Sequence, residues 1–321
     1  MTPLSVSNPR ARLGLGVGID MPWSMDGQGF RFAPSNGDTL SGDLRCFFDR
    51  YRTVFDYAFV AFQPKARNVL RAADYFEAYD SFFASAEGHI PRTRAFHQTI
   101  LNLGSLEPYD PEPIIEFTNE LIARYHFSWV LEDLGIWSIR GKPLPYPLPP
   151  FLTAEGLRAS IRNVDRYQRG LVAPLYVEFP GFTEGISFTI GRMDAFDYFA
   201  QLAAETGCRV TIDIGHIMSY QWLQGRTQRI HYDEFQRLPL NQCFELHLSG
   251  CQVIAGKFRD LHNGVLLDEQ IDVLEYLLPH CPNLKGVTYE DPKFTRDGEL
   301  VARSRLNFER LAKIVNLWKS E

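Results

Sequence analysis

Short apolar runs alternate along this chain with longer segments in which apolar residues recur at helical spacing. The runs are rich in aliphatic and aromatic residues, as is typical of strands that are buried on both faces. We expect eight strands, at residues 13–19, 57–62, 94–97, 128–132, 175–178, 210–213, 244–248 and 286–290. Between and after them we expect helices at residues 40–51, 66–85, 111–126, 153–169, 194–206, 268–278 and 303–318.

Eight strands that alternate with helices over 321 residues predict an α/β fold, the (β/α)8 or TIM barrel. Neither a domain-splitting linker nor a repeat at solenoid spacing interrupts the pattern, so we expect residues 1–321 to form a single TIM-barrel domain. In this fold the functional residues lie at the C-terminal ends of the strands.

Three segments depart from the simple pattern. Residues 141–150, Gly-Lys-Pro-Leu-Pro-Tyr-Pro-Leu-Pro-Pro, are too rigid and too poor in amide donors to form a strand or a helix. They are either a surface linker or a lid that lines the substrate site. The glycines of residues 14–18 lack the GxGxxG spacing of a nucleotide site. The aromatic helix at residues 74–83 is either a docking face or, as we expect, part of the core.

Composition excludes several classes of protein. A net charge of −6 argues against broad binding to nucleic acid, which needs a basic surface. The five cysteines show no CxxC spacing, which favours reduced thiols and a cytoplasmic protein. The first residues lack the apolar stretch of a signal peptide, and there is no run of about 18 apolar residues, so we expect neither secretion nor a membrane span.

Polar residues gather at the predicted strand ends. In a strand, residues two apart face the same side, so Glu245 and His247 are both expected to point into the mouth of the barrel. Asp260 and His262 follow in the next loop, and His216 follows Asp213 closely. The remaining strand-end candidates are His97, Glu132, Glu178, Asp213 and Glu290.

Carboxylates and imidazoles together form the ligand set of divalent metals such as iron, manganese and zinc. A single strand-end carboxylate is more often a helix cap or half of an ion pair. Several carboxylates that converge on one mouth need a cation, because unpaired like charges are costly at low dielectric. Arg209 and Arg259 offer part of that charge, but the interleaved histidines favour metal. We therefore expect a metal site made of all ten residues, with Asp213, Glu245 and His247 also catalytic.

Seven segments in order resemble the multinuclear non-heme iron-dependent oxidative enzymes that modify cysteines of ribosomally made peptides, as in methanobactin and 3-thiaglutamate biosynthesis. The segments begin with His97-Gln-Thr-Ile-Leu-Asn-Leu-Gly-Ser105 and Glu132-Asp-Leu-Gly-Ile-Trp-Ser138 with its Pro-Leu-Pro loop. They continue with Val177-Glu-Phe-Pro180, Asp213-Ile-Gly-His216, Glu245-Leu-His-Leu-Ser-Gly250, Asp260-Leu-His262 and Tyr289-Glu-Asp291.

This resemblance implies a xylose-isomerase-like barrel with two or three irons in mixed Fe(II)/Fe(III) valence. It implies O2 as cosubstrate and a cysteine-containing precursor peptide as substrate. It also implies a heterodimer with a small partner protein that binds the leader part of the peptide.

Some positions differ from the resembling family. Asp133 and Cys251 stand where many relatives have histidine, Phe179 stands where they have asparagine, and Ala61-Phe-Gln-Pro64 replaces a His-Pro-Glu-Asn segment. These differences favour a specialised branch, and of the two named types we favour the thiaglutamate type, in which the β-carbon of a C-terminal cysteine is excised.

Two other classes of function use the same barrel. A sugar isomerase or epimerase would hold one or two manganese, magnesium or zinc ions, and a non-catalytic peptide-binding protein would hold none. A zinc endonuclease of the same superfamily is disfavoured by the acidic charge.

Overall fold

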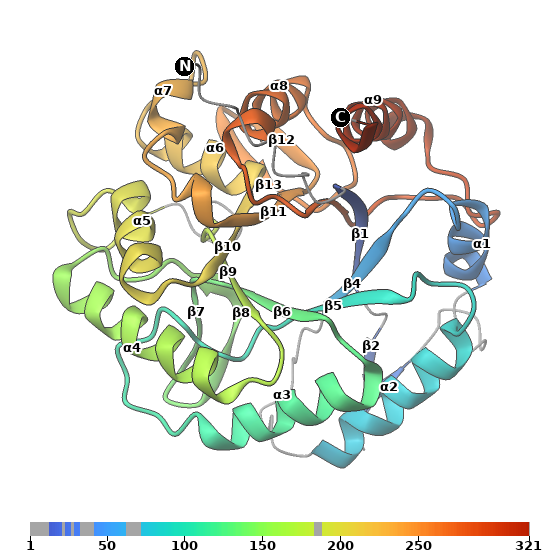
Figure 1. Cartoon of the computed structure of the whole chain (residues 1–321), viewed down its shortest axis with the longest axis horizontal. Helices are drawn as coiled ribbons and strands as arrows, with labels where there is room; N and C mark the ends of the chain where they lie inside the picture. The colour runs from blue at the N-terminus through green and yellow to red at the C-terminus, as the bar shows by residue number, and fades with distance from the viewer. Residues whose placement is uncertain are drawn as a thin grey trace, which may run out of the picture.

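The protein is described by a computed structural model, which covers residues 13–20, 23–26, 29–32, 42–61, 72–182 and 188–320. Eight parallel strands close into a barrel in the order β1, β14, β11, β10, β9, β6, β5, β4 (Figure 1). The predicted barrel is therefore confirmed. The strands are β1 (Gly14–Asp20), β4 (Tyr57–Ala61), β5 (Thr93–His97), β6 (Trp129–Asp133), β9 (Leu175–Glu178), β10 (Arg209–Asp213), β11 (Cys243–Leu248) and β14 (Gly286–Glu290).

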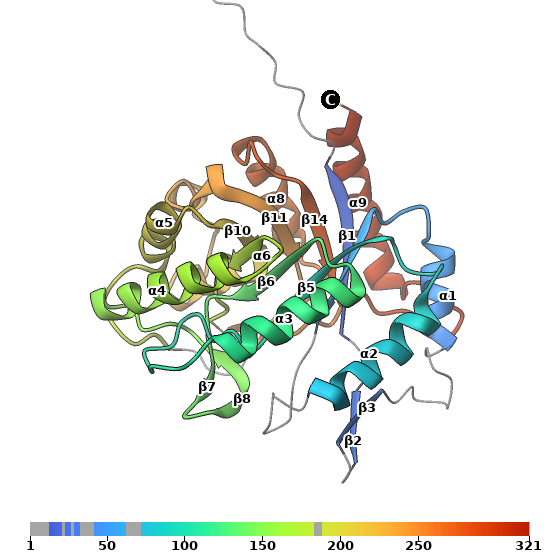
Figure 2. The same cartoon turned by 60° about the horizontal axis from the view of Figure 1, so that its bottom comes forward.

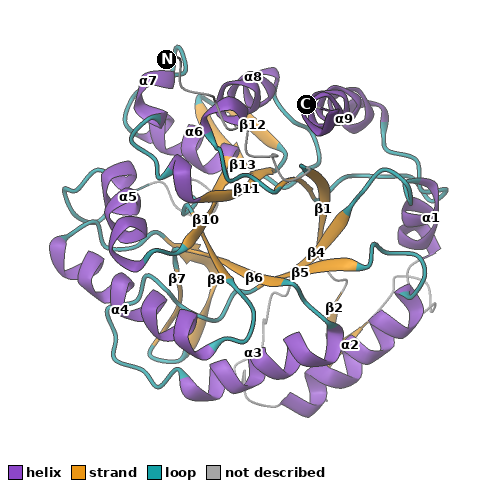
Figure 3. Ribbon diagram, in the orientation of Figure 1, coloured by secondary structure: helices purple, strands orange, loops and turns teal. Residues whose placement is uncertain are grey.

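Helices surround the barrel on its outside (Figure 3). The expected helices are present as α1 (Gly42–Arg50), α2 (Ala72–Ala86), α3 (Glu112–Tyr125), α4 (Ala154–Gly170), α5 (Ala195–Thr206), α8 (Asp268–Leu277) and α9 (Ala302–Ser320). Some of the sequence predictions fall outside the described residues. They concern residues 1–12, 40, 41, 62–64 and 66–71. No helix within the described ranges has the length and apolar character needed to cross a membrane.

Two α-helices among the described residues were not predicted. They are α6 (Ile214–Leu223), which begins directly after β10, and α7 (Tyr232–Phe235). Most of α6 is buried, so it lacks the polar face that marks an amphipathic helix. Its start is nevertheless capped, because Oδ1 of Asp213 accepts the backbone N–H of His216 at 2.7 Å.

In the part of the chain that the structure describes, three two-stranded hairpins extend the fold: β2 (Trp23–Asp26) with β3 (Gly29–Phe32), β7 (Ile136–Ile139) with β8 (Lys142–Leu148), and β12 (Cys251–Ile254) with β13 (Lys257–Asp260). The first two extend from the same end of the barrel (Figure 2). The prediction that residues 141–150 could not form a strand was wrong. In a two-stranded hairpin only alternate residues need a paired amide, so prolines are tolerated in β8.

Large side chains fill the barrel interior, and their size accounts for the presence of glycines in β1. An ideal Cβ at Gly16 would lie 2.2 Å from the ring of Tyr57, and one at Gly18 would lie 2.2 Å from the ring of Phe59. The glycines therefore leave room for two aromatic rings in the interior. Likewise, Phe76, Tyr79, Phe82 and Phe83 of α2 are buried in the core, as expected.

Candidate metal centre

Among the described residues, three overlapping groups of acidic and histidine side chains lie at the C-terminal ends of the barrel strands. Within each group, one potential ligand atom from every residue lies within 4.8 Å of the others. All members are buried. The first group is Glu178, Asp213, His247 and Glu290, the second is Asp133, Glu178 and His216, and the third is Asp213, His216 and Asp260.

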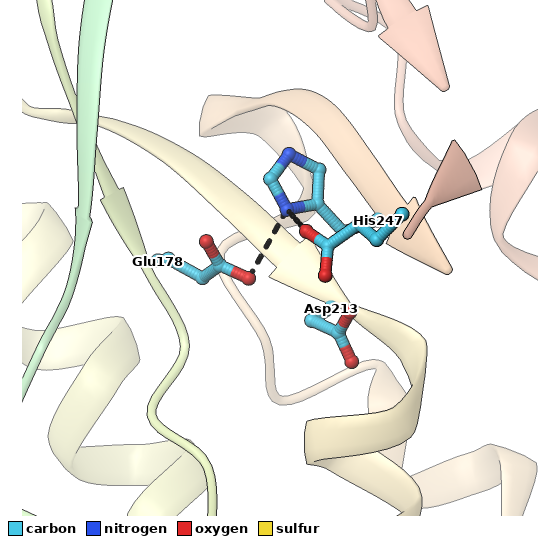
Figure 4. A group of neighbouring side chains, drawn as sticks. Glu178, Asp213 and His247 are labelled. Carbon is cyan, nitrogen blue, oxygen red and sulfur yellow. Dashed lines mark ion pairs between the residues drawn. The ribbon is translucent and has the colours of Figure 1, made fainter. Parts of the chain in front are cut away.

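The first group is centred on Nδ1 of His247. This nitrogen lies 2.6 Å from Oε1 of Glu290 and 3.2 Å from Oε1 of Glu178. Figure 4 shows Glu178 and Asp213 approaching the ring from the ends of neighbouring strands. Oδ2 of Asp213 is buried, and no hydrogen bond reaches it from the described residues. A buried carboxylate oxygen that accepts no hydrogen bond is available to bind a metal ion.

His97 adds an imidazole to the carboxylates of the second group. Its Nε2 lies 3.4 Å from Oε2 of Glu178 and 3.9 Å from Oδ2 of Asp133. Its Nδ1 donates to the carbonyl oxygen of Gln98 at 3.0 Å. Because one nitrogen carries the proton, the lone pair of the neutral ring lies at Nε2, toward the two carboxylates.

His216 is oriented in the same way in the third group. Its Nδ1 donates to the carbonyl oxygen of Phe179 at 2.8 Å, and its Nε2 lies 3.5 Å from Oδ2 of Asp260. His262 lies at the rim, with Nε2 3.7 Å from Oδ1 of Asp260 and Nδ1 2.9 Å from Asp291. Both His262 and Asp291 adopt positive φ angles, a strained backbone that often accompanies functional sites.

The pKa shifts follow from burial and from this crowding of charge. Burial raises the pKa of Asp213 well above its usual value, and Asp260 and Glu290 add to the effect while His216 opposes it. Burial lowers the pKa of His97, but Glu178 and Asp133 outweigh it and raise the pKa to about 9. The metal-free site thus retains protons where a metal ion would supply positive charge.

No lysine or arginine side chain lines the site within the described part of the chain. Arg209, one of the two cations considered from the sequence, lies at the start of β10 and stacks 4.7 Å from the ring centroid of Phe244. Arg259 lies on β13 outside the lining of the site. The residues present therefore fit divalent metal, because carboxylates and imidazoles converge on a cavity that, among the described residues, no lysine or arginine lines.

The structure does not bring Glu132 into these groups. Its two oxygens accept the backbone N–H groups of Ile100, Leu101 and Asn102 at 2.6–2.8 Å. Glu132 therefore holds the loop after β5. The next residue, Asp133, joins the second group, and the sequence prediction did not include it. Asp133 shares the inward face of β6 with Leu131, but the sequence of this strand shows no alternation that would have identified that face.

Glu245 also lies outside the three groups. As expected from the alternation of β11, it points into the barrel, but it lies deeper than His247. There it accepts hydrogen bonds from Tyr57, Trp129 and Thr288.

A cavity of about 280 Å³ opens onto the groups. Trp137, Tyr146 and Pro147 of the β7–β8 hairpin form part of its wall, together with His97, Glu178 and His262. Of the two interpretations of residues 141–150, the one that places them at the site is therefore the correct one. The volume is at the lower end of the range for small-ligand sites.

Residues 82–305 match the family described as "RiPP precursor modification enzyme MbnB/TglH/ChrH". The chain belongs to this family. The resemblance drawn from the sequence motifs is thus confirmed.

Relatives of known sequence match part of the chain. A "UPF0276 protein" of Bordetella pertussis is 27% identical over 192 residues, which are 57% of this chain and 63% of that protein. A "UPF0276 protein" of Caulobacter vibrioides is 26% identical over 187 residues, 55% of this chain and 64% of that protein. The chain therefore aligns with slightly less than two thirds of these relatives' length.

Two solved structures share the fold. A "Xylose isomerase-like TIM barrel Protein from Mycobacterium smegmatis in Complex with Magnesium" aligns with a TM-score of 0.55 at 9% identity, over 96% of this chain and 98% of that one. A D-psicose 3-epimerase aligns with a TM-score of 0.50 at 13% identity, over 94% of this chain and 99% of that one. At this identity the likeness establishes a xylose-isomerase-like barrel and no activity.

Proposed function

We propose that this protein is an iron- and O2-dependent enzyme that oxidatively modifies a cysteine residue of a ribosomally synthesised precursor peptide. The observation that carries the proposal is that each of the three groups shares one residue with each of the others. The shared residues are Glu178, Asp213 and His216. Carboxylates shared between neighbouring groups can bridge metal ions, which supports a multinuclear centre rather than a single ion.

The orientations of the imidazoles suggest how the ligands divide. His247 would hold the first ion with Glu178, Asp213 and Glu290. His97 would hold the second with Asp133 and Glu178. His216 would hold the third with Asp213 and Asp260, and His262 stands at its rim. Each position would then combine carboxylate oxygen with imidazole nitrogen, a ligand set suited to iron.

Bound iron would supply O2 activation and electron transfer, and would favour the thiolate form of a cysteine side chain. The protein would supply binding and orientation. The cavity admits a side chain with little flanking backbone, and Trp137 and Tyr146 would hold that backbone against the hairpin. The rest of the precursor would stay outside, which agrees with a small partner protein that captures the leader part in a heterodimer.

The finer reaction that we favour is removal of the β-carbon of a C-terminal cysteine, as in the thiaglutamate type. Mass spectrometry of the peptide after reaction tests this choice. A product that has lost one carbon supports excision, whereas a product that retains all its carbons contradicts it.

The proposal predicts that iron and turnover are lost together. Asp213→Ala and His247→Ala should each remove iron and abolish conversion of a cysteine-containing precursor peptide encoded beside the gene. Iron content is measured by mass spectrometry of the metal, and conversion by mass spectrometry of the peptide. A variant that contains no iron and still turns over would contradict the proposal.

A metal-dependent sugar isomerase or epimerase remains the second candidate, because the first group alone offers four ligands to one divalent ion. Isomerisation of a free sugar without oxygen, by protein loaded with manganese or magnesium, would support that candidate. An isomerase or epimerase of this kind would not require the second and third groups of ligands.

A further inference from the structure

We propose that Glu245 is a positioning residue that fixes the imidazole of His247 from inside the barrel, so that Nδ1 of His247 faces the metal. The inference rests on the metal centre proposed above. It assigns Glu245 a role different from the ligand or catalytic role expected from the sequence.

Donors from three different strands occupy the Glu245 carboxylate. Oε1 accepts hydrogen bonds from Tyr57 Oη on β4 at 3.0 Å and from Thr288 Oγ1 on β14 at 2.6 Å. Oε2 accepts a hydrogen bond from Trp129 Nε1 on β6 at 2.9 Å. A metal ion at these oxygens would have to displace donors that are packed in the barrel interior, and the donors would then lack an acceptor.

The ring of His247 lies between this carboxylate and the first group. Nε2 lies 3.3 Å from Oε1 of Glu245, and Nδ1 lies 2.6 Å from Glu290 and 3.2 Å from Glu178. These are ion-pair contacts, and neither nitrogen makes a hydrogen bond with the described residues. A neutral imidazole carries one N–H, and a metal binds the other nitrogen. With the proton on Nε2, next to Glu245, His247 presents the lone pair of Nδ1 to the first group.

The surrounding core holds this arrangement in place. The ring of Phe59 stacks on the ring of His247 with centroids 5.2 Å apart. An ideal Cβ at Gly286 would lie 2.2 Å from Oη of Tyr57, so the glycine leaves room for this donor. Burial and the Glu245 charge raise the pKa of Tyr57 well above its usual value, so its hydroxyl stays protonated and able to donate.

Nuclear magnetic resonance of protein labelled with 15N-histidine and loaded with zinc alone tests the inference. Zinc is diamagnetic, and the couplings of the ring identify which nitrogen binds the metal. We expect His247 to bind through Nδ1 and to carry its proton on Nε2, with His247→Asn used to assign its signals. Binding through Nε2 in the wild-type protein would overturn the proposal.

Two variants of Glu245 separate positioning from general packing. Glu245→Gln keeps an oxygen that can accept the N–H of His247, and Glu245→Leu removes it. We expect Glu245→Leu to lower zinc affinity by about 10- to 100-fold, and Glu245→Gln to lose less while keeping Nδ1 bound. If Glu245→Leu does not fold, two measurements decide whether Glu245 positions His247. They are the zinc affinity of Glu245→Gln and the identity of the protonated ring nitrogen of His247 in the wild type.

Glu132→Gln is the matched control, because Glu132 is a buried carboxylate whose hydrogen bonds come from backbone amides. We expect its zinc affinity to equal that of the wild type. An equal loss of affinity in Glu132→Gln and Glu245→Gln would show general disruption of the barrel and overturn the positioning role.

These outcomes are independent of the proposed oxidation. Wild-type protein with zinc on Nδ1 but no iron after purification would support the positioning role and contradict the proposed function. Wild-type protein that is purified with iron, but that binds zinc through Nε2 of His247 when loaded with zinc, would support the proposed function and contradict the positioning role.

Discussion

At the residue scale, Asp213 serves the fold and the candidate centre with different atoms. Oδ1 caps α6 through the N–H of His216, whereas Oδ2 is buried without a hydrogen bond from the described residues. Two of the three groups share this side chain. Its burial beside other carboxylates makes it costly to the fold when no cation is bound.

Asp213→Asn separates the two roles. Asparagine still caps a helix, so we expect the free energy of unfolding of the metal-free variant to equal or exceed that of metal-free wild type. Metal affinity should fall by at least about tenfold, because a bridging charge is lost. Thermal unfolding with and without metal measures both effects. A variant that metal stabilises as much as it stabilises wild type would contradict the role of Asp213.

Glu132→Gln should act on stability alone. The carboxamide places an NH2 group where a carboxylate oxygen accepts a backbone N–H, so at least one buried donor loses its acceptor. We expect the free energy of unfolding to fall by about 1–3 kcal/mol. Denaturant unfolding measures the loss, and iron bound per folded chain should not change. Loss of iron from folded protein would instead favour the ligand role expected from the sequence.

The sequence predicted the residue types of the site. It did not predict how deep in the barrel each side chain lies or which face of its strand it occupies. Parallel strands of a barrel end at one mouth, which was enough to bring Glu178, Asp213, His247 and Glu290 together. Whether Glu132 or Asp133 faces that mouth depends on the register of β6, which a run of five residues without clear alternation does not fix. Asp133, opposite Glu178 on β9, is the one that does.

At the scale of elements, the barrel strands were predictable because most of them are buried apolar runs. The β7–β8 and β12–β13 hairpins were not, because their pairing is local and their strands are partly exposed. Yet both contribute to the site. The first supplies Trp137 and Tyr146 to the cavity wall, and the second ends in Asp260.

Tyr146→Ala tests the role of the β7–β8 hairpin. Tyr146 is 54% exposed and lines the cavity, so we expect little change in stability or metal content. Binding of the precursor peptide should weaken by about 1 kcal/mol, a roughly fivefold rise in KM. The control is Ile139→Ala, since Ile139 is 42% exposed on the same hairpin and does not line the cavity. Equal effects of the two variants would argue against a substrate-binding face at Tyr146.

At the scale of the whole molecule, closure of the barrel brings together side chains that are far apart in the sequence, from His97 to Asp291. Five buried carboxylates in the three groups repel one another unless cations lie between them. The fold and the metal should therefore depend on each other.

Removal of metal tests this dependence. We expect a chelator to lower Tm, because an ion at a hundredfold excess over its Kd stabilises the folded state by about 2.7 kcal/mol. Differential scanning calorimetry measures the shift, and adding iron back without oxygen should restore it. An unchanged Tm after verified removal of the metal would show that the carboxylates are satisfied without it.

The measurement that tests the central claim most directly is metal content together with Mössbauer spectroscopy on protein purified without oxygen. The proposed function predicts two or three irons per chain, with spectra of coupled Fe(II) and Fe(III). A single zinc or manganese ion and no iron, in active and fully folded protein, would contradict it.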